Sequence, residues 1–274
     1  MCHDEGHIWK GKLMRHQHIL LALAGLTAWA PLLRAAEDVA WQKTASTHFI
    51  VMHTGDETLA KAVSERAESC YSTIAADLGY TRYQNFWLWD KRVKILIYPT
   101  AEAFAAACDA PSWAAGRANA KKHEIASYKQ SGEGFLSALL PHEMSHLILA
   151  DFIGEENIPL WLTEGFAQWE ESDRKSIPAM PASGQQFFLK DLVTMDIRRE
   201  ADRTRVGLFY AQSASVVGYL IKTCGGESFG KFCRALRNGK PVETALTTAF
   251  PRDVPTLETL GQKWLKAVTL PPEK

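Results

Sequence analysis

The sequence lacks an excess of charge of either sign. Lysine and arginine together number 31, and aspartate and glutamate also number 31. No run of like charges extends beyond a few residues, so the chain has no evident source of electrostatic attraction to the phosphates of nucleic acid. We therefore exclude nucleic acid as a partner.

An apolar run of the length needed for an ordinary membrane span is also missing near the N-terminus. The run from Ile19 to Leu33 has 15 residues and contains Gly25 and Pro31, whereas a transmembrane helix needs about 20 apolar residues. Basic residues precede the run, and small residues follow it at 35 and 36, as in a signal peptide. We predict that residues 1–36 are a signal peptide, that the protein is exported to the periplasm or the extracellular space, and that no stable membrane span remains after cleavage.

Two features of this leader stay open. Residues 1–13 contain two acidic side chains, which is unusual before a signal sequence, and Met14 followed by Arg15 is an alternative start of translation. Cleavage after Ala35 or after Ala36 leaves a large residue three positions before the cut in either case.

Cysteine is scarce in the exported part. The four that follow the leader would permit up to two disulfides with three pairings in an oxidising compartment. Alternatively, all four are small buried hydrophobic residues. Sequence leaves both interpretations open for Cys70, Cys108, Cys224 and Cys233.

The whole chain is 46% hydrophobic, and the part after the leader, 37–274, is long enough for one large domain. In residues 37–130, β-prone runs at 49–52 and 93–98 alternate with helical patterns at 59–78 and 104–108. We therefore expect a small sheet in this first lobe.

A third strand is predicted from His123 to Tyr128. Polar and apolar residues alternate there, and Lys121, Lys122 and Ser131 flank the run. This pattern is typical of an exposed edge strand, which could pair with a bound extended peptide.

The second lobe, 131–274, has mainly helical periodicity, so we predict an α+β fold in which the helix-rich lobe follows the sheet. Gly116 reads as part of a turn, and residues 172–185 and 196–205 as solvated loops. The expected helices are 135–152, 160–171, 186–195, 208–223, 228–236 and 257–268.

The first of these helices contains an HExxH motif, His142-Glu143-Met144-Ser145-His146, between strongly apolar flanks. Residues four apart lie on one face of a helix, so His142 and His146 can bind one tetrahedral metal ion such as zinc. The alternative is a pair of hydrogen-bonded core histidines, which would leave several buried polar atoms in need of partners.

A third protein ligand would leave one coordination position for water, and Glu164 follows in the segment LWLTEGFA. HExxH, a short spacer and a glutamate on a second helix resemble the gluzincin peptidases, which include thermolysin and the aminopeptidase-N-like enzymes. LWLTEGFA is close to the LWLNEGFA of the latter, with Thr163 in place of the usual asparagine. The layout of residues 92–235 is similar to the small bacterial peptidase-MA-like domains.

The resemblance implies a zincin-like fold, one Zn²⁺ ion held by His142, His146 and Glu164, and no other cofactor. Glu143 would be the general base that activates water for hydrolysis of a peptide or protein substrate. The donor to the oxyanion would be Tyr210, at a position similar to the catalytic tyrosine of the aminopeptidase-N-like enzymes. Tyr219 and Tyr128 are alternative donors.

Other ionisable residues are set aside. His48, His53 and His123 are at strand ends, where we expect rim residues rather than ligands. Glu170 and Glu171 close the second helix, where we expect a solvated end, with contact between Glu171 and the ligands as the alternative.

The aminopeptidase-N-like enzymes recognise the free N-terminal amine of the substrate with a GxMEN segment. The nearest glycine-led stretch here, 116–120, has no acidic residue, so we favour endopeptidase over aminopeptidase action. Two other classes stay open: an inactive metal-binding domain that recruits peptides or envelope partners, and a zinc amidase that acts on peptidoglycan.

Overall fold

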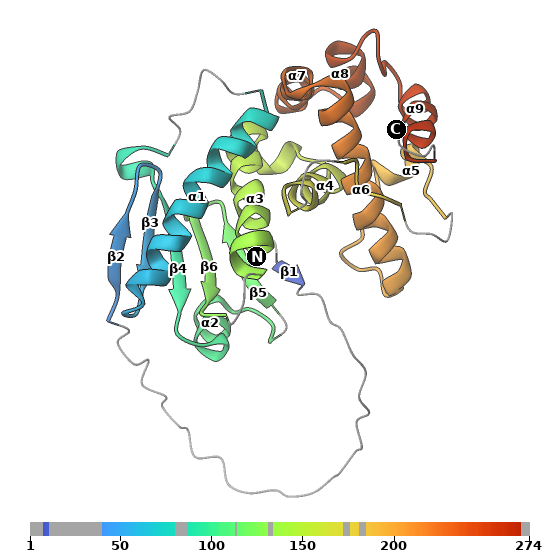
Figure 1. Ribbon diagram of the computed structural model, residues 1–274. Helices are drawn as coiled ribbons and strands as arrows, with labels where there is room; N and C mark the ends of the chain where they lie inside the picture. Colours follow the sequence, from blue (N-terminus) through green and yellow to red (C-terminus); the bar gives the residue numbers. More distant parts are fainter. Residues whose placement is uncertain are drawn as a thin grey trace, which may run out of the picture.

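The computed structural model has a mixed β-sheet in its N-terminal part, followed by a helix-rich body (Figure 1). It describes residues 8–10 by their backbone and residues 40–79, 87–112, 114–130, 134–171, 176–180 and 185–269 in full. The fold is therefore α+β and compatible with a zincin-like architecture. The predicted leader lies outside the described residues, except for 8–10.

The sheet has six strands in the order β1-β5-β6-β4-β3-β2. β4 pairs in parallel with both β3 and β6. The pairs β1–β5, β5–β6 and β2–β3 are antiparallel. The strands are β1 (Ile8–Lys10), β2 (Gln42–Ala45), β3 (Phe49–His53), β4 (Val93–Tyr98), β5 (Ala114–Asn119) and β6 (Glu124–Tyr128).

The prediction that His123–Tyr128 forms an edge strand was wrong. β6 pairs with β4 on one side and with β5 on the other. Gly116, which we expected in a turn, lies inside β5, and this glycine is needed within the sheet. A Cβ there would come 2.9 Å from Cδ2 of Leu139, so β5 approaches the helical body only where a side chain is absent.

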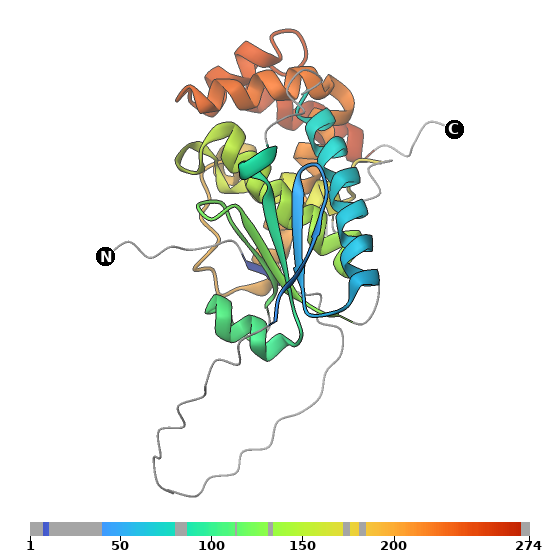
Figure 2. The same ribbon diagram turned by 90° about the vertical axis from the view of Figure 1, so that its left-hand side faces the viewer.

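Helices cover both faces of the sheet (Figure 2). Helix α1 (Glu57–Asp77), capped by Asp56, packs on the face that also meets α3, and α2 (Ala101–Cys108) packs on the other. Alternation along β6 matches these two layers: Ile125 joins the main hydrophobic core, and Ala126 joins a smaller cluster around Phe104.

The helical body packs on this sheet through α3, and the buried residues of sheet and body form one main hydrophobic core. Its segments are η2 (Phe135–Leu139), α3 (Leu140–Ile153), η3 (Glu155–Asn157), α4 (Leu160–Glu171), α5 (Leu189–Leu192), α6 (Arg203–Cys224), α7 (Gly226–Arg237), α8 (Val242–Ala249) and α9 (Leu257–Thr269). A single 3₁₀ turn, η1 (Trp89–Lys91), precedes β4. Helix α8 was not predicted.

Two predicted boundaries in this body were wrong. The helix expected over 186–195 is reduced to α5. The side-chain amide of Gln212 accepts from the N–H of Phe187 and donates to its C=O, so these backbone groups are not available for helical hydrogen bonds. Helix α6 begins inside the loop expected at 196–205, because the carboxylate of Asp202 caps the N–H groups of Thr204 and Arg205.

All four cysteines after the leader are thiols in the structure, two buried (Cys70, Cys233) and two half-buried (Cys108, Cys224). Burial raises the pKa of the Cys233 thiol, which keeps it protonated. None of the helices in the described part of the chain is both long and apolar enough to cross a membrane.

Candidate metal centre

The HExxH residues lie on α3, immediately after a π-helical turn. Pro141 stands in the first turn of α3, where its missing N–H costs least. The preceding turn, η2, has the wider π spacing, and Nε of Arg66 on α1 donates to the carbonyl of Leu136 at 3.0 Å. A π-turn of this kind re-aims the residues that follow it, here the ones that carry the motif.

Helix α4 brings Glu164 to this face of α3. Both helices are apolar around the site, and α4 is packed on its other side by α6. Contact between α4 and α6 is close enough that a Cβ on Gly165 would lie 2.5 Å from the carbonyl oxygen of Ser213. Glycine next to Glu164 therefore sets the separation of the two helices.

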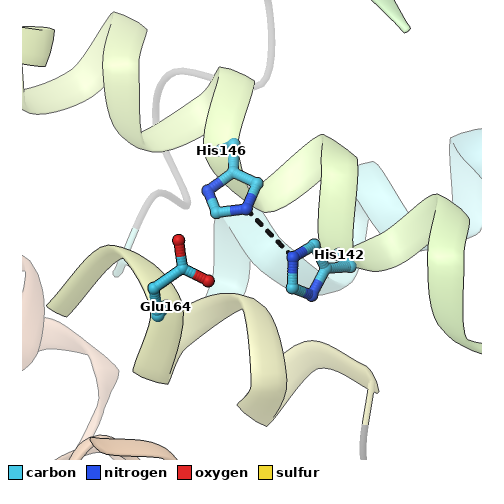
Figure 3. A group of neighbouring side chains, drawn as sticks. All are labelled: His142, His146 and Glu164. Atoms are coloured by element: carbon cyan, nitrogen blue, oxygen red, sulfur yellow. Dashed lines mark hydrogen bonds between the residues drawn. The ribbon is translucent and has the colours of Figure 1, made fainter. Parts of the chain in front are cut away.

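The structure brings His142, His146 and Glu164 together in one buried cluster (Figure 3). Their exposed fractions are 3%, 4% and 7%. Nε2 of His142 lies 3.0 Å from Nε2 of His146, and one ligand atom from each of the three residues lies within 4.8 Å of the others. The Glu164 carboxylate is turned toward the two imidazoles.

This donor set fits a zinc ion. Ligand atoms about 2.0–2.1 Å from a tetrahedral centre lie about 3.3 Å from each other. This is close to the 3.0 Å between the two imidazole nitrogens, and a Glu164 carboxylate oxygen lies within 4.8 Å of a nitrogen of each histidine. Two nitrogens and one carboxylate also match the ligands of catalytic zinc sites with an open fourth position.

Two further carboxylates, those of Glu143 and Glu171, lie near His142. Glu143 is completely buried, and Glu171, at the end of α4, bonds Nδ1 of His142. Burial opposes a charge on His142 and lowers its pKa, but the bond to Glu171 and the carboxylates of Glu143 and Glu164 outweigh burial and raise the pKa above its ordinary value. The site is therefore strongly attractive to positive charge.

The expectation of a solvated end for α4 was wrong. Glu170 is 4% exposed, and Glu171 is half-buried against His142. By contrast, the hydroxyl of Thr163, the residue in place of the usual asparagine, donates at 3.4 Å to the carbonyl of Pro159, just before α4. The alternative expectation for Glu171, contact with the ligands, rests on its i+7 spacing from Glu164, since seven residues return to the same helix face, and it is the one that the structure bears out.

Tyr210 lies in the second turn of α6, near Glu164. Burial, followed by the Glu164 carboxylate, raises the pKa of its phenol, which therefore stays protonated and able to donate at neutral pH. The alternative tyrosines lie elsewhere: Tyr219 is near Cys224 and Asp253, and the ring of Tyr128 packs on Phe104.

The other three histidines in the described part of the chain lie apart from this cluster. His48 bonds Glu68 through Nδ1 at 2.6 Å and stacks on Tyr71. Nε2 of His123 lies 3.2 Å from the carboxylate of Asp151. His53 is 3% exposed, so it is a core residue rather than the rim residue that we expected.

A mixed sheet, a helix-rich body and a buried His–His–Glu cluster between two helices are typical of metal-dependent hydrolases of the zincin type. Residues 87–267 match the family model of the Peptidase MA superfamily. The match covers well over half of the chain, and the protein belongs to this superfamily. A search of curated proteins found no match.

Membership supports a metallopeptidase-like function and a peptide or protein substrate. The matched range begins at residue 87, just before η1, and ends in α9, and it includes the whole cluster on α3 and α4. Of the elements in the described residues, β1, β2, β3 and α1 precede it.

Proposed function

We propose that the protein is an exported zinc peptidase of the gluzincin type, with one peptidase domain over residues 37–274. The observation that carries this proposal is the buried His142, His146 and Glu164 cluster, which lies inside the matched range. Zinc bound there would supply a Lewis acid that polarises a carbonyl and lowers the pKa of a coordinated water to about 7.

In this proposal Glu143 is the general base. It follows His142 directly but lies outside the three-ligand set, and its complete burial keeps bulk water from competing for it. Its carboxylate would accept the proton of the attacking water and return it to the leaving amine. Tyr210 would donate a hydrogen bond to the oxyanion, which its protonated phenol allows.

Endopeptidase action is favoured because no acidic residue lies on β5 to read a free amine. An extended substrate would pair antiparallel with the outer edge of β5, where β1 pairs in the present structure. Residues 8–10 belong to the predicted leader, so removal of 1–36 would expose this edge. Gly116 of β5 lies close to Leu139, the last residue of η2, which is three residues before His142.

The decisive test compares wild type with Glu143→Gln on an unbiased peptide library, with bound zinc measured in both. General acid–base groups contribute about 10²–10⁴-fold, so we expect a loss of this size with the zinc content unchanged. Glu156→Gln, which removes an exposed carboxylate from η3, is the matched control and should keep full activity. Equal turnover by wild type and Glu143→Gln would refute the mechanism.

The same preparation distinguishes the other function classes. Casein and purified cell wall are tested beside the peptide library. Release of fragments from cell wall alone would indicate a peptidoglycan amidase with the same metal and base. Inertness on all three substrates, with zinc bound, would indicate a binding domain.

A further inference from the structure

Glu171 is not part of the motif that identifies the three ligands, yet it forms a direct hydrogen bond with one of them. Its Oε1 bonds Nδ1 of His142, the ring nitrogen that faces away from His146. Only 4% of the His142 side chain and 17% of the Glu171 side chain are exposed, so water competes weakly for this bond.

The bond has a chemical consequence for His142. An ionised carboxylate only accepts hydrogen bonds, so Nδ1 must carry the proton. The lone pair of neutral His142 then lies on Nε2, the atom that is 3.0 Å from Nε2 of His146 and faces the cluster. Glu171 thereby selects the tautomer that can bind a metal through Nε2.

Glu171 is itself held in place. Nε2 of Gln168, one turn earlier on α4, donates to the same Oε1 at 2.9 Å. Glu164 lies two turns earlier on the same helix, and seven residues in an α-helix return to nearly the same face. One face of α4 thus provides both a candidate ligand and the group that orients the opposing histidine.

From this geometry we propose that Glu171 is a positioning residue of the metal site, acting through His142, and that Gln168 fixes its carboxylate. The inference rests on the proposed metal centre and adds a determinant of metal affinity. Removal of groups that hold a metal-bound histidine typically costs 10–100-fold in metal affinity.

The test measures metal binding rather than turnover. Zn²⁺ affinity is determined by chelator competition, and the visible absorption of the Co²⁺-loaded protein reports the coordination geometry. Glu171→Ala should bind Zn²⁺ about 10–100-fold more weakly than wild type, with an altered Co²⁺ spectrum. Glu171→Gln should lose less, because its amide oxygen still accepts from Nδ1. Glu156→Gln controls for the loss of one carboxylate.

Gln168→Ala provides a second route to the same answer if Glu171→Ala fails to fold. It leaves Glu171 in place but removes its anchor, so we expect a smaller loss of affinity in the same direction. Wild-type affinity and an unchanged Co²⁺ spectrum in folded Glu171→Ala, or in Gln168→Ala where Glu171→Ala does not fold, would overturn the role of Glu171 while leaving the zinc peptidase intact. Failure of the wild type itself to bind Zn²⁺ or Co²⁺ would overturn both.

Discussion

The carbonyl oxygen of Ser213 on α6 lies 2.5 Å from the point where a side chain on Gly165 of α4 would begin. A real Cβ does not approach a backbone oxygen so closely, so any larger residue must push the two helices apart. Glu164 precedes Gly165, and Tyr210 lies one turn before Ser213. The contact therefore controls how the candidate ligand and the candidate oxyanion donor face each other.

Gly165→Ala should consequently lower the free energy of unfolding by about 1–3 kcal/mol, as overpacking does, and should weaken zinc binding because Glu164 moves. Urea unfolding and chelator competition measure the two effects. Gly207→Ala is the matched control: this glycine is on α6 with nothing within 4 Å of its Cβ position. It should be neutral or stabilise by up to about 1 kcal/mol.

Tyr210→Phe should lower kcat about 10²–10³-fold with little change in KM, because a donor to the developing oxyanion is lost while the ring remains. Steady-state kinetics on a cleavable library peptide measures this split. Tyr219→Phe, on the same helix but near Cys224 and Asp253, should keep wild-type kinetics. An equal effect of the two substitutions would contradict the assignment of Tyr210.

Removal of zinc should lower the melting temperature. A ligand present at 1,000 times its dissociation constant stabilises the folded state by about 4 kcal/mol, and without metal the carboxylates around His142 remain buried together. Calorimetry with a chelator, and again after zinc is restored, follows the change. His146→Ala should respond little to either addition, and a chelator response as large as that of wild type would exclude His146 as a ligand.

Acid should destabilise the protein partly through Glu68. Burial raises the pKa of this carboxyl, but the hydrogen bonds that it accepts from the ring and the backbone N–H of His48 oppose burial, and the pKa lies below its ordinary value of 4.5. The unfolded chain therefore takes up a proton at a higher pH than the folded protein. The stabilisation is present above about pH 4.5 and is lost as the pH falls through the lower pKa of the folded state.

Glu68→Gln should accordingly reduce stability at neutral pH and flatten its dependence on pH between about 3 and 5. Urea unfolding at a series of pH values measures this slope. Glu65→Gln, an exposed position on the same helix, serves as the control. A slope as steep in Glu68→Gln as in wild type would show that other carboxyls dominate acid unfolding.

Local sequence patterns predicted much of the secondary structure of the chain. The apolar stripe from Leu59 to Leu78 became α1, and the run at 93–98 became β4, because periodicity reports directly which face is buried. The same patterns failed at Phe187, whose backbone is held by a side chain 25 residues away. They also failed at β5, where small residues carry almost no periodic signal.

The sequence by itself determined that His142 and His146 share one helix face, because i and i+4 geometry is local, and spacing and resemblance pointed to Glu164. Only the tertiary structure decided that β6 is interior to the sheet, that Tyr210 rather than Tyr219 approaches Glu164, and that Glu171 bonds His142. Each of these depends on how separate elements pack, through contacts such as Gly165 with Ser213 and Gly116 with Leu139. Such contacts join residues far apart in the chain, and no local pattern records them.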